Sequence, residues 1–558
     1  MPRVRRWPLL LLLALASPAV AQPAGLAGPN GAIDLNRFYT ADETNAILAE
    51  WARLYPELTR LYSIGRSHLG AELMVMEVTS ERTGPTEEKP ALYVDGGIHA
   101  GELTGSAVAL HLLEHLLRGY GHDQRVTRLL DARAFYVRPK FNPDGSDLVL
   151  HEDQPIRSTV RPWDEDGDGL LDEDPANDLD GDGRILQMRY RDAAGEWVYL
   201  SEGIDDDGDG RINEDGVGGI DMNRNFPRNW EREHLQPGAG PFPLSEPETH
   251  ATVRFLSERP NITGIVHGHT AGGFVYRLPS AVDPALLDER DLALILHLGE
   301  EYTRDTGRPV RPSSTHATDH RYGTLISWGY WDRGVVGWVP EYVPPDAWVP
   351  DYDGDGEKSE AERRRFDRER FGGRYFKEWE PYDHPQLGPV EIGGWHRRYW
   401  GQNPPPELLE EETRQQLHWI LWLAERSPLL SLATPRVTAL GDGTVRVEAT
   451  VTNEGFLPTH LTARGHVGRE TRGGGLADQV VRPPEAFLEL EGAALTAGDA
   501  RVALPHLAGS EPFTGIVTER SRAVGWTVRP EGAGARVRVV VRSGTGGTRR
   551  SEWVEVGR

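Results

Sequence analysis

The spacing of apolar residues divides the chain into two parts. Between about residues 34 and 427, segments with apolar residues at helical spacing alternate with short apolar runs of strand type. The helical pattern covers residues 40–54, 101–117 and 407–425, and the strand pattern covers residues 73–79, 91–94, 134–137, 262–266 and 335–342. Helices alternating with short buried strands indicate an α/β sheet.

The pattern changes after Pro428. From residue 436 onward, apolar and polar residues alternate in segments such as 444–452, 536–542 and 552–556, with Gly-rich turns between them and no long helical pattern. This arrangement predicts an all-β, Ig-like sandwich domain over residues 428–558. We find no catalytic group of residues in it, and contact with a surface or a glycan is the role that we consider for it.

The first residues have the composition of a targeting segment. Arg3, Arg5 and Arg6 form a basic start, residues 9–16 are apolar, and Ala-Val-Ala at 19–21 is a small-residue cleavage site. We therefore predict a signal peptide over residues 1–21, a linker over 22–33 and a secreted protein, extracellular or periplasmic. The apolar run is too short for a permanent span, and no later run is longer, so we expect no membrane anchor.

The amino-acid composition limits which partners and which catalytic groups the protein can have. The formal charge of −25 makes nucleic acid and anionic membranes unsuitable partners. The 38% hydrophobic content and 16 tryptophans are sufficient for buried cores, and 558 residues are too many for one core. With no cysteine in the chain, disulfides, thiolate catalysis and Cys-bound zinc are excluded. A catalytic metal must therefore be bound by His, Asp and Glu.

A histidine and a glutamate lie three residues apart at the end of one predicted strand. The segment 96–102 reads Gly-Gly-Ile-His-Ala-Gly-Glu, with His99 and Glu102 at the start of a predicted helix. A catalytic zinc site uses three protein ligands and one open position, and this turn supplies two of the three. The His-x-x-Glu pattern alone occurs by chance in many proteins, so its meaning depends on the motifs that follow.

Four further features follow in order along the chain. They are Asn-Pro-Asp-Gly at 142–145, Asp-Met-Asn-Arg-Asn-Phe at 221–226, Val-His-Gly-His-Thr at 266–270, and Glu341, which ends a strand pattern after Trp328. In this order, from about residue 34 to 427, they resemble the zinc carboxypeptidase (metallocarboxypeptidase) family. The resemblance implies a mixed central sheet flanked by helices and a peptide substrate.

The resemblance also implies roles for individual residues. His99, Glu102 and His269 would bind Zn²⁺, and Glu341 would be the general base that takes a proton from water and passes it to the leaving amine. Asn223 and Arg224 would bind the terminal carboxylate of the substrate, because an Arg fork matches a carboxylate in a way that Lys cannot.

Two assignments have an alternative. His267 and His269 lie on the same face of a strand, so either can be the third ligand. We favour His269, because a Thr follows it as a Ser or Thr commonly follows the family's third ligand. Arg157 and Arg161 both fit the arginine that stabilises the oxyanion, and we favour Arg161.

The substrate pocket departs from the family pattern. Asp319 stands where the family has a mobile tyrosine, with His320 and Tyr322 close by, and Tyr322 could take that role. Ile326 aligns with a residue at the base of the specificity pocket. An apolar residue there favours an apolar or aromatic terminal side chain.

Residues from about 150 to 216 form an acidic insert that the family's core does not require. It contains three Asp-x-Asp-x-Asp-Gly runs, and a fourth run lies further on. The residues concerned are Asp164, Asp166 and Asp168; Asp178, Asp180 and Asp182; Asp205, Asp207 and Asp209; and Asp351, Asp353, Asp355 and Glu362. Alternating carboxylates before a glycine are typical of Ca²⁺ loops. Our hypothesis is that Ca²⁺ orders loops around the cleft without taking part in the chemistry, and a flexible acidic loop is the alternative.

We therefore predict a secreted zinc peptidase that hydrolyses the C-terminal peptide bond of peptides with a free carboxylate. One alternative is a peptidoglycan or isopeptide amide hydrolase of the same fold. Another is a non-catalytic, calcium-stabilised binding protein, which would require loss of a ligand or of the base. His99, Glu102, His269 and Glu341 are all present.

Overall fold

The computed structural model describes residue 28 and residues 31–165, 167–280, 286–314, 321–343, 346–470 and 476–557. The predicted signal peptide and most of the predicted linker lie outside these residues, as do Asp166, Asp319 and His320. Among the helices of these ranges, none combines the length and the apolar composition that crossing a membrane requires.

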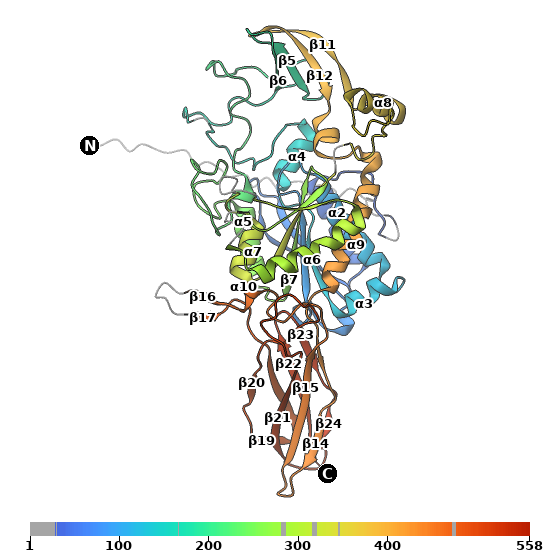
Figure 1. Cartoon of the computed structure of the whole chain (residues 1–558), viewed down its shortest axis with the longest axis vertical. Coiled ribbons are helices and arrows are strands. Elements are labelled where there is room, and N and C mark those ends of the chain that lie inside the picture. The colour runs from blue at the N-terminus through green and yellow to red at the C-terminus, as the bar shows by residue number, and fades with distance from the viewer. Residues whose placement is uncertain are drawn as a thin grey trace, which may run out of the picture.

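Eight of the described strands form one central sheet (Figure 1). In spatial order they are β1 (Thr59–Arg66), β2 (Glu72–Val78), β4 (Ala134–Arg138), β3 (Ala91–Gly96), β7 (Ile262–Thr270), β10 (Val336–Tyr342), β8 (Phe274–Arg277) and β9 (Val310–Pro312). β4, β3, β7 and β10 are parallel neighbours, and β8 pairs parallel with β9. The pairs β1–β2, β2–β4 and β10–β8 are antiparallel. The prediction of an α/β fold with a mixed sheet is confirmed.

Helices cover the sheet, with α5 and α7 on one side of it and α2 and α9 on the other in Figure 1. The helices are α1 (Ala41–Leu54), α2 (Thr104–Gly119), α3 (Gln124–Ala132), α4 (Pro143–Glu152), α5 (Pro247–Ser257), α6 (Glu289–Thr306), α7 (Leu325–Arg333), α8 (Glu360–Phe371) and α9 (Pro406–Glu425). α1 begins where predicted because Thr40 and Glu43 form a reciprocal capping box. The helix α2 buries most of its side chains and packs against α9, β3 and β7.

Short 3₁₀ or π turns complete the α/β part. They are η1 (Glu81–Thr83), η2 (Thr86–Glu88), η3 (Met222–Arg224) and η5 (Arg397–Gln402). One contiguous core joins the sheet to its helices and includes Trp51, Trp338 and Trp419. This core fixes the positions of the strand ends from which the site is built.

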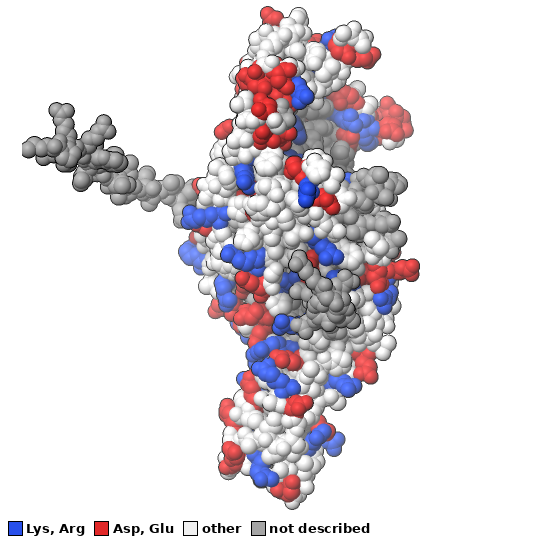
Figure 2. Space-filling model, turned by 90° about the vertical axis from the view of Figure 1, so that its left-hand side faces the viewer, with Lys and Arg blue, Asp and Glu red and all other residues white. Residues whose placement is uncertain are grey.

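The acidic insert belongs to a second, smaller sheet in the order β11-β12-β5-β6. The strands β5 (Gln187–Arg191) and β6 (Trp197–Ser201) come from the insert, whereas β11 (Phe376–His384) and β12 (Gly388–Trp395) come from much later in the chain. The sheet lies at one end of the molecule (Figure 1), and Figure 2 shows Asp and Glu side chains gathered at that end. Two distant segments therefore build the acidic end together.

The C-terminal part is an antiparallel sandwich, as predicted. One sheet contains β13 (Leu430–Leu432), β14 (Arg436–Ala439), β15 (Val445–Asn453), β21 (Ser521–Pro530) and β19 (Ala493–Ala497). The other contains β20 (Arg501–Ala503), β18 (Glu485–Glu491), β22 (Arg536–Ser543), β23 (Gly547–Arg550) and β24 (Val554–Glu555). Alternate residues of β15, β21 and β22 meet in one core around Trp526. The short α10 (Ala463–His466) contacts α6 and α7. The ribbon of β16 (Gly468–Glu470) and β17 (Leu476–Gln479) projects to one side next to it (Figure 1).

Candidate metal centre and active site

The carboxyl ends of the parallel strands β3, β7 and β10 lie side by side and carry the predicted site. His99 follows β3, His269 lies near the end of β7, and Glu341 lies near the end of β10. In the strand register, Glu341 is paired with His269 and Asp95 is paired with His267. Side chains from segments far apart in the sequence therefore converge because parallel strands end at the same edge.

His99, Glu102 and His269 bring one ligand atom each to a common point. The Nδ1 atom of His99 lies 2.7 Å from Glu102 Oε1 and 3.1 Å from His269 Nδ1, and His269 Nδ1 lies 2.9 Å from Glu102 Oε2. The three residues are 2–3% exposed. Burial lowers the pKa of His269 to about 3, so its ring is neutral at pH 7, as a metal ligand must be.

Two nitrogens and one carboxylate that converge in this way suit zinc. Zn²⁺ prefers a tetrahedral set of N and O ligands with one position left for substrate. The Nδ1 atoms of His99 and His269 both point at the Glu102 carboxylate and lie 3.1 Å from each other, so three ligand atoms surround one point. The donor set therefore fits the metal that the sequence motif implies.

Close packing of glycines places the His-x-x-Glu turn. A Cβ atom on Gly105 would lie 2.6 Å from the carbonyl oxygen of Gly268, and a Cβ on Gly96 would lie 2.1 Å from the carbonyl carbon of Gly105. Glycine at these positions lets the first turn of α2 rest directly on the ends of β3 and β7. His99 and Glu102 thereby come within reach of His269.

Asp221 holds the far side of the His99 ring. His99 Nε2 lies 3.0 Å from Asp221 Oδ1, and Arg157 Nε donates to Asp221 Oδ2 over 3.0 Å. Although burial opposes it, the charges of Arg157 and His99 hold the pKa of Asp221 well below its ordinary value. A carboxylate on the second ring nitrogen fixes the tautomer and orientation of a metal-binding histidine. The sequence contained this signal, since Asp221 opens the Asp-Met-Asn-Arg-Asn-Phe run, but no role was predicted for it.

The two candidate third ligands have different surroundings. His269 belongs to the ligand group, whereas His267 directs Nδ1 to Asp95 Oδ1 over 2.5 Å and is fully buried. Both rings do lie on the same face of β7, with centroids 4.5 Å apart. The two histidines therefore differ in the direction of their ring nitrogens, and only His269 directs Nδ1 to the ligand group.

Glu341 faces the metal group from the neighbouring strand. Burial raises the pKa of Glu341 above its ordinary value, and the Glu102 carboxylate adds to this shift. The positive charges of Arg157, Arg321 and Arg224 oppose it. The Glu341 carboxyl group therefore lies between another carboxylate and several arginines. Such surroundings shift the pKa of a group that accepts a proton during catalysis.

Asn223 and Arg224 lie next to the same group. Asn223 Nδ2 is 3.4 Å from His269 Nε2, and its Oδ1 accepts a hydrogen bond from the Leu325 N–H. The guanidinium of Arg224 donates to the carbonyl of Asn223 and lies 4.0 Å from Asp221 Oδ2. Burial of the Arg224 guanidinium lowers its pKa from the ordinary value.

The two candidate arginines have different partners. Arg157 Nη1 donates to Glu102 Oε1 over 3.2 Å, whereas Arg161 Nη1 pairs with the fully buried Glu246 over 2.9 Å. The structure therefore brings Arg157 to the metal group and directs Arg161 away from it.

The predicted pocket residues lie near the site to different degrees. The N–H of Tyr322 donates to Gln236 Oε1, and Tyr322 directly follows Arg321, whose charge acts on Glu341. Ile326 is 1% exposed and packs against Gly337 in the main core. Asp319 and His320 lie outside the described residues.

The aspartates of the acidic loops also gather. Groups with oxygens close enough for one ion are Asp168, Glu173 and Asp207; Asp178, Asp180 and Glu202; Asp205, Asp207 and Asp209; and Asp351, Asp353 and Asp355. Other predicted members have other contacts: Asp164 accepts backbone N–H groups, Asp182 pairs with Lys377 and Arg184, and Glu362 closes a capping box with Ser359. Glu173 and Glu202 were not predicted, because both lie outside the Asp-Gly runs.

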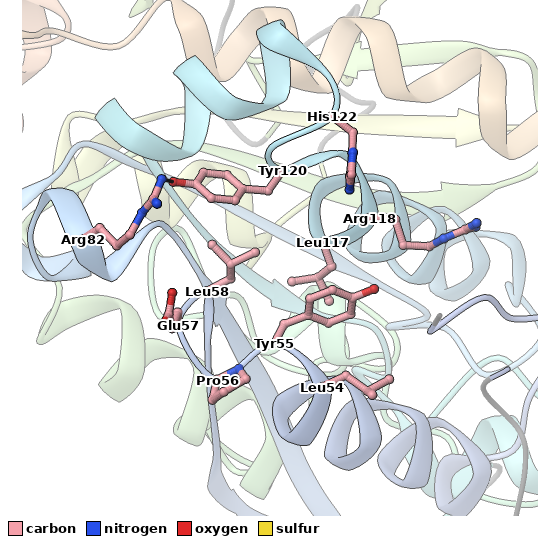
Figure 3. Close-up of a pocket in the computed structure, with 10 residues that line it drawn as sticks. All are labelled: Leu54, Tyr55, Pro56, Glu57, Leu58, Arg82, Leu117, Arg118, Tyr120 and His122. Carbon is pink, nitrogen blue, oxygen red and sulfur yellow. Dashed lines mark hydrogen bonds between the residues drawn. The ribbon is translucent and has the colours of Figure 1, made fainter. Parts of the chain in front are cut away.

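A large surface cleft lies away from all these residues. It has a volume of about 890 Å³ and is lined by the ends of α1 and α2, with Arg82 donating a hydrogen bond to Tyr120 (Figure 3). The helix α2 starts beside Glu102 and ends at this cleft, which places the cleft roughly 24 Å from the metal group at 1.5 Å rise per residue. The cleft is therefore separate from the candidate metal centre.

The sequence of residues 44–324, half of the chain, matches the family model described as "Zinc carboxypeptidase". The chain belongs to the zinc carboxypeptidase family. Residues 429–554 match a model described as a domain of unknown function. The second match begins close to the predicted start of the sandwich.

Similar proteins match over short regions. Carboxypeptidase D of Anas platyrhynchos is 33% identical over 20% of this chain and 8% of its own length. Carboxypeptidase M of Mus musculus is 33% identical over 27% of this chain and 31% of its own length. The "Inactive metallocarboxypeptidase ECM14" of Saccharomyces cerevisiae is 34% identical over 17% of this chain and 22% of its own length. The matched regions span less than a third of each of these relatives.

Similar solved structures are distant. The structure of thrombin activatable fibrinolysis inhibitor has a TM-score of 0.46 at 16% identity, over 71% of this chain and 76% of that one. Carboxypeptidase A from Helicoverpa armigera has a TM-score of 0.45 at 13% identity, over 72% of this chain and 76% of that one.

Proposed function

We propose that this protein is a secreted zinc carboxypeptidase that hydrolyses the C-terminal peptide bond of peptides with a free carboxylate. The observation that carries the proposal is the meeting of His99, Glu102 and His269 next to Glu341 and Arg224. A metal group, a proton acceptor and a buried cation in one place are the parts that this reaction needs.

His99, Glu102 and His269 would hold the zinc ion, with Asp221 orienting His99. When bound, Zn²⁺ polarises the scissile carbonyl and lowers the pKa of water. Glu341 would take the proton from the attacking water and later donate it to the leaving amine. Its raised pKa suits both tasks, because the group must bind and release a proton in one cycle.

We assign the oxyanion to Arg157 in preference to Arg161. The Arg157 side chain is 47% exposed and still reaches Glu102 and Asp221, so a substrate oxygen can approach it from the open side. Arg161 is paired with Glu246, and leaving that carboxylate buried without a partner would be costly.

Asn223 and Arg224 would bind the terminal carboxylate. Arg224 has its guanidinium within the buried site, where a pair with a carboxylate is less screened than on the surface. Tyr322 remains our proposal for the aromatic hydroxyl near the substrate. Ile326 would act on specificity through its packing against Gly337 and not by direct exposure.

We also propose that the acidic loops bind Ca²⁺ and that the basic and apolar N-terminal segment directs secretion. The clusters of carboxylates support Ca²⁺ binding. Outside the cell the Ca²⁺ concentration is high enough to fill loops of modest affinity, so the two proposals are consistent with each other. A calcium-selective chelator should then lower the melting temperature.

The amide-hydrolase alternative shares the same metal group and differs in substrate. An assay on peptides with free and amidated C-termini, with and without zinc chelation, tests the main proposal and separates it from this alternative. Release of single residues from free ends only supports a carboxypeptidase, and equal cleavage of both sets indicates an amidase or endopeptidase.

A further inference from the structure

The acidic insert contains one sequence pattern twice, at residues 164–174 and 205–215. In each copy three aspartates alternate up to a glycine, and the copy closes on Asp or Asn, then Glu, then Asp. The closing triplets are Asp172, Glu173 and Asp174 in the first copy and Asn213, Glu214 and Asp215 in the second.

The described residues of the two copies share several backbone features. Gly167 and Gly208 have φ angles of 85° and 88°, and Asp172 and Asn213 both have the left-handed conformation, with φ of 53° and 60°. The first carboxylate of each copy accepts hydrogen bonds from the two glycine N–H groups of its own loop: Asp164 from Gly167 and Gly169, and Asp205 from Gly208 and Gly210. A repeated sequence has therefore produced a repeated loop.

The copies are joined by reciprocal hydrogen bonds. The N–H of Asp206 donates to Asp174 Oδ1 over 3.2 Å, and the N–H of Glu165 donates to Asp215 Oδ2 over 3.3 Å. In both cases the last aspartate of one copy accepts from the second residue of the other. The backbone N–H of Asp174 also donates to the carbonyl of Asp215 over 3.0 Å. The two loops thus form one unit with an approximate two-fold relation.

Within the described residues, several buried carboxylate oxygens of this unit accept no hydrogen bond. Asp215 is 0% exposed, and its Oδ1 has no hydrogen-bond partner in the described ranges. The same holds, within those ranges, for both buried carboxylate oxygens of Glu173 and of Glu214. Burial and then the charges of Glu173 and Glu165 raise the pKa of Asp215 to about 7, and burial and Asp174 do the same for Glu214. Buried carboxylates without a partner are costly unless a cation neutralises them.

The Glu173 carboxylate lies between the two copies. Its oxygen, one from Asp168 of its own copy and one from Asp207 of the other all lie within 4.8 Å of one another. Oxygen atoms alone, supplied by several carboxylates on irregular loops, suit Ca²⁺, whereas Mg²⁺ requires a compact octahedral set and Zn²⁺ prefers nitrogen or sulfur ligands.

We propose that the described residues of the two copies, 164–165 with 167–174 and 205–215, form one paired calcium module, in which Glu173 and Glu214 each bind an ion at the junction of the two copies. This deepens the proposal that the insert binds Ca²⁺ and rests on it. Because each closing glutamate lies at the junction, occupation of one site orders the other, and the two ions bind in a coupled manner.

The module lies between two segments of the active site. Arg157 precedes the first copy and Asp221 follows the second, and the N–H of Thr159 donates to the carbonyl of Ile220 between them over 3.0 Å. The N–H of Gly218 also donates to Asp172 Oδ1 over 3.0 Å. Calcium bound in the module therefore fixes the distance between two segments of the chain. One segment carries Arg157, and the other carries residues 221–224.

The test is calorimetric titration of the zinc-loaded full chain with CaCl₂ after removal of calcium by a selective chelator. The variants are Glu173→Gln and Glu214→Gln, and the control is Glu196→Gln, an equal charge change on an exposed residue of the β5–β6 turn. Each module variant should weaken binding of two ions by about ten-fold or more and reduce the calcium-dependent rise in melting temperature. The control should bind as the unchanged protein does.

The possible results separate the proposals. If the unchanged protein binds no Ca²⁺, both calcium proposals fail, whatever its peptidase activity. If it binds Ca²⁺ but either module variant behaves like the control, or weakens one ion alone, the paired module is wrong. Zinc content shows whether each variant is folded, and Glu173→Asp, which keeps the charge but shortens the reach, replaces a variant that does not fold and should weaken the same two ions.

Discussion

Glu341 and His269 occupy paired positions on two adjacent parallel strands, β10 and β7. The proposed proton acceptor and a proposed metal ligand are thus placed by strand register, which the apolar cores on both faces of the sheet determine. A slip of one residue would turn Glu341 to the opposite face of the sheet. The geometry of the site is therefore a direct consequence of how the sheet is packed.

Replacing Glu341 by Gln should abolish turnover while leaving zinc bound. The amide has nearly the same shape but cannot accept the proton, and loss of a positioned general base costs about 10²- to 10⁴-fold in rate. Steady-state kinetics and metal analysis check this, with Glu300→Gln on the exposed face of α6 as the control. Activity within a few-fold of the control would rule out Glu341 as the base.

Replacing Asp221 by Asn should weaken zinc binding by about 10- to 100-fold. The carboxylate accepts from the ring of His99 and pairs with Arg157, and the amide loses the charge that holds both in place. Competition with a chromogenic chelator measures the affinity. Asp42→Asn, in the exposed first turn of α1, is the matched control, and equal zinc affinities for the two variants would contradict the role of Asp221.

The two arginines should respond differently to substitution by Lys. Arg157→Lys should lower kcat by about 10²-fold or more, because a single ammonium group cannot contact Glu102, Asp221 and a substrate oxygen together. Arg161→Lys should leave kcat nearly unchanged and lower thermal stability, since Arg161 serves the buried Glu246. The reverse result would restore Arg161 to the catalytic role.

Much of the fold and the metal group follows from the sequence. Strands such as β3 and β7 have apolar residues on both faces, so the sheet was predictable, and His99 lies just after β3 and His269 near the end of β7. The choice between His267 and His269 was not decided by the strand pattern, because both lie on the same face of β7. Arg157 and Arg161 could not be separated, because only tertiary contacts decide which side chain points at Glu102. The role of Glu173 was not predictable either, since it completes its group with Asp207 from a different loop.

Stability should fall in acid because two histidines of the C-terminal part, His460 and His506, are buried. Burial lowers the pKa of His460 to about 4 and that of His506 to about 3, against 6.5 in the unfolded chain. The unfolded state therefore binds more protons below pH 6.5, and unfolding becomes easier as the pH falls from 6.5 towards 4. Between pH 6.5 and 5, protonation of each histidine in the unfolded state should lower the free energy of unfolding by about 2 kcal/mol.

Thermal melting of the unchanged protein and of His506→Gln across this pH range measures the effect. His506 Nε2 donates to the carbonyl of Val481, and His506 Nδ1 accepts from the Thr459 hydroxyl. Gln can partly replace these two contacts. The variant should show a flatter dependence on pH than the unchanged protein. Parallel curves would mean that His506 does not titrate on unfolding.

The most direct measurement of the proposed function is product analysis on matched peptides with free and amidated C-termini. The zinc-loaded enzyme should release one C-terminal residue at a time from the free-ended peptides, lose this activity on zinc chelation, and leave the amidated peptides intact. Arg224→Lys should raise KM for free-ended peptides, because its fork would contact their carboxylate. Equal cleavage of both sets, or activity that survives complete removal of zinc, would contradict a zinc carboxypeptidase.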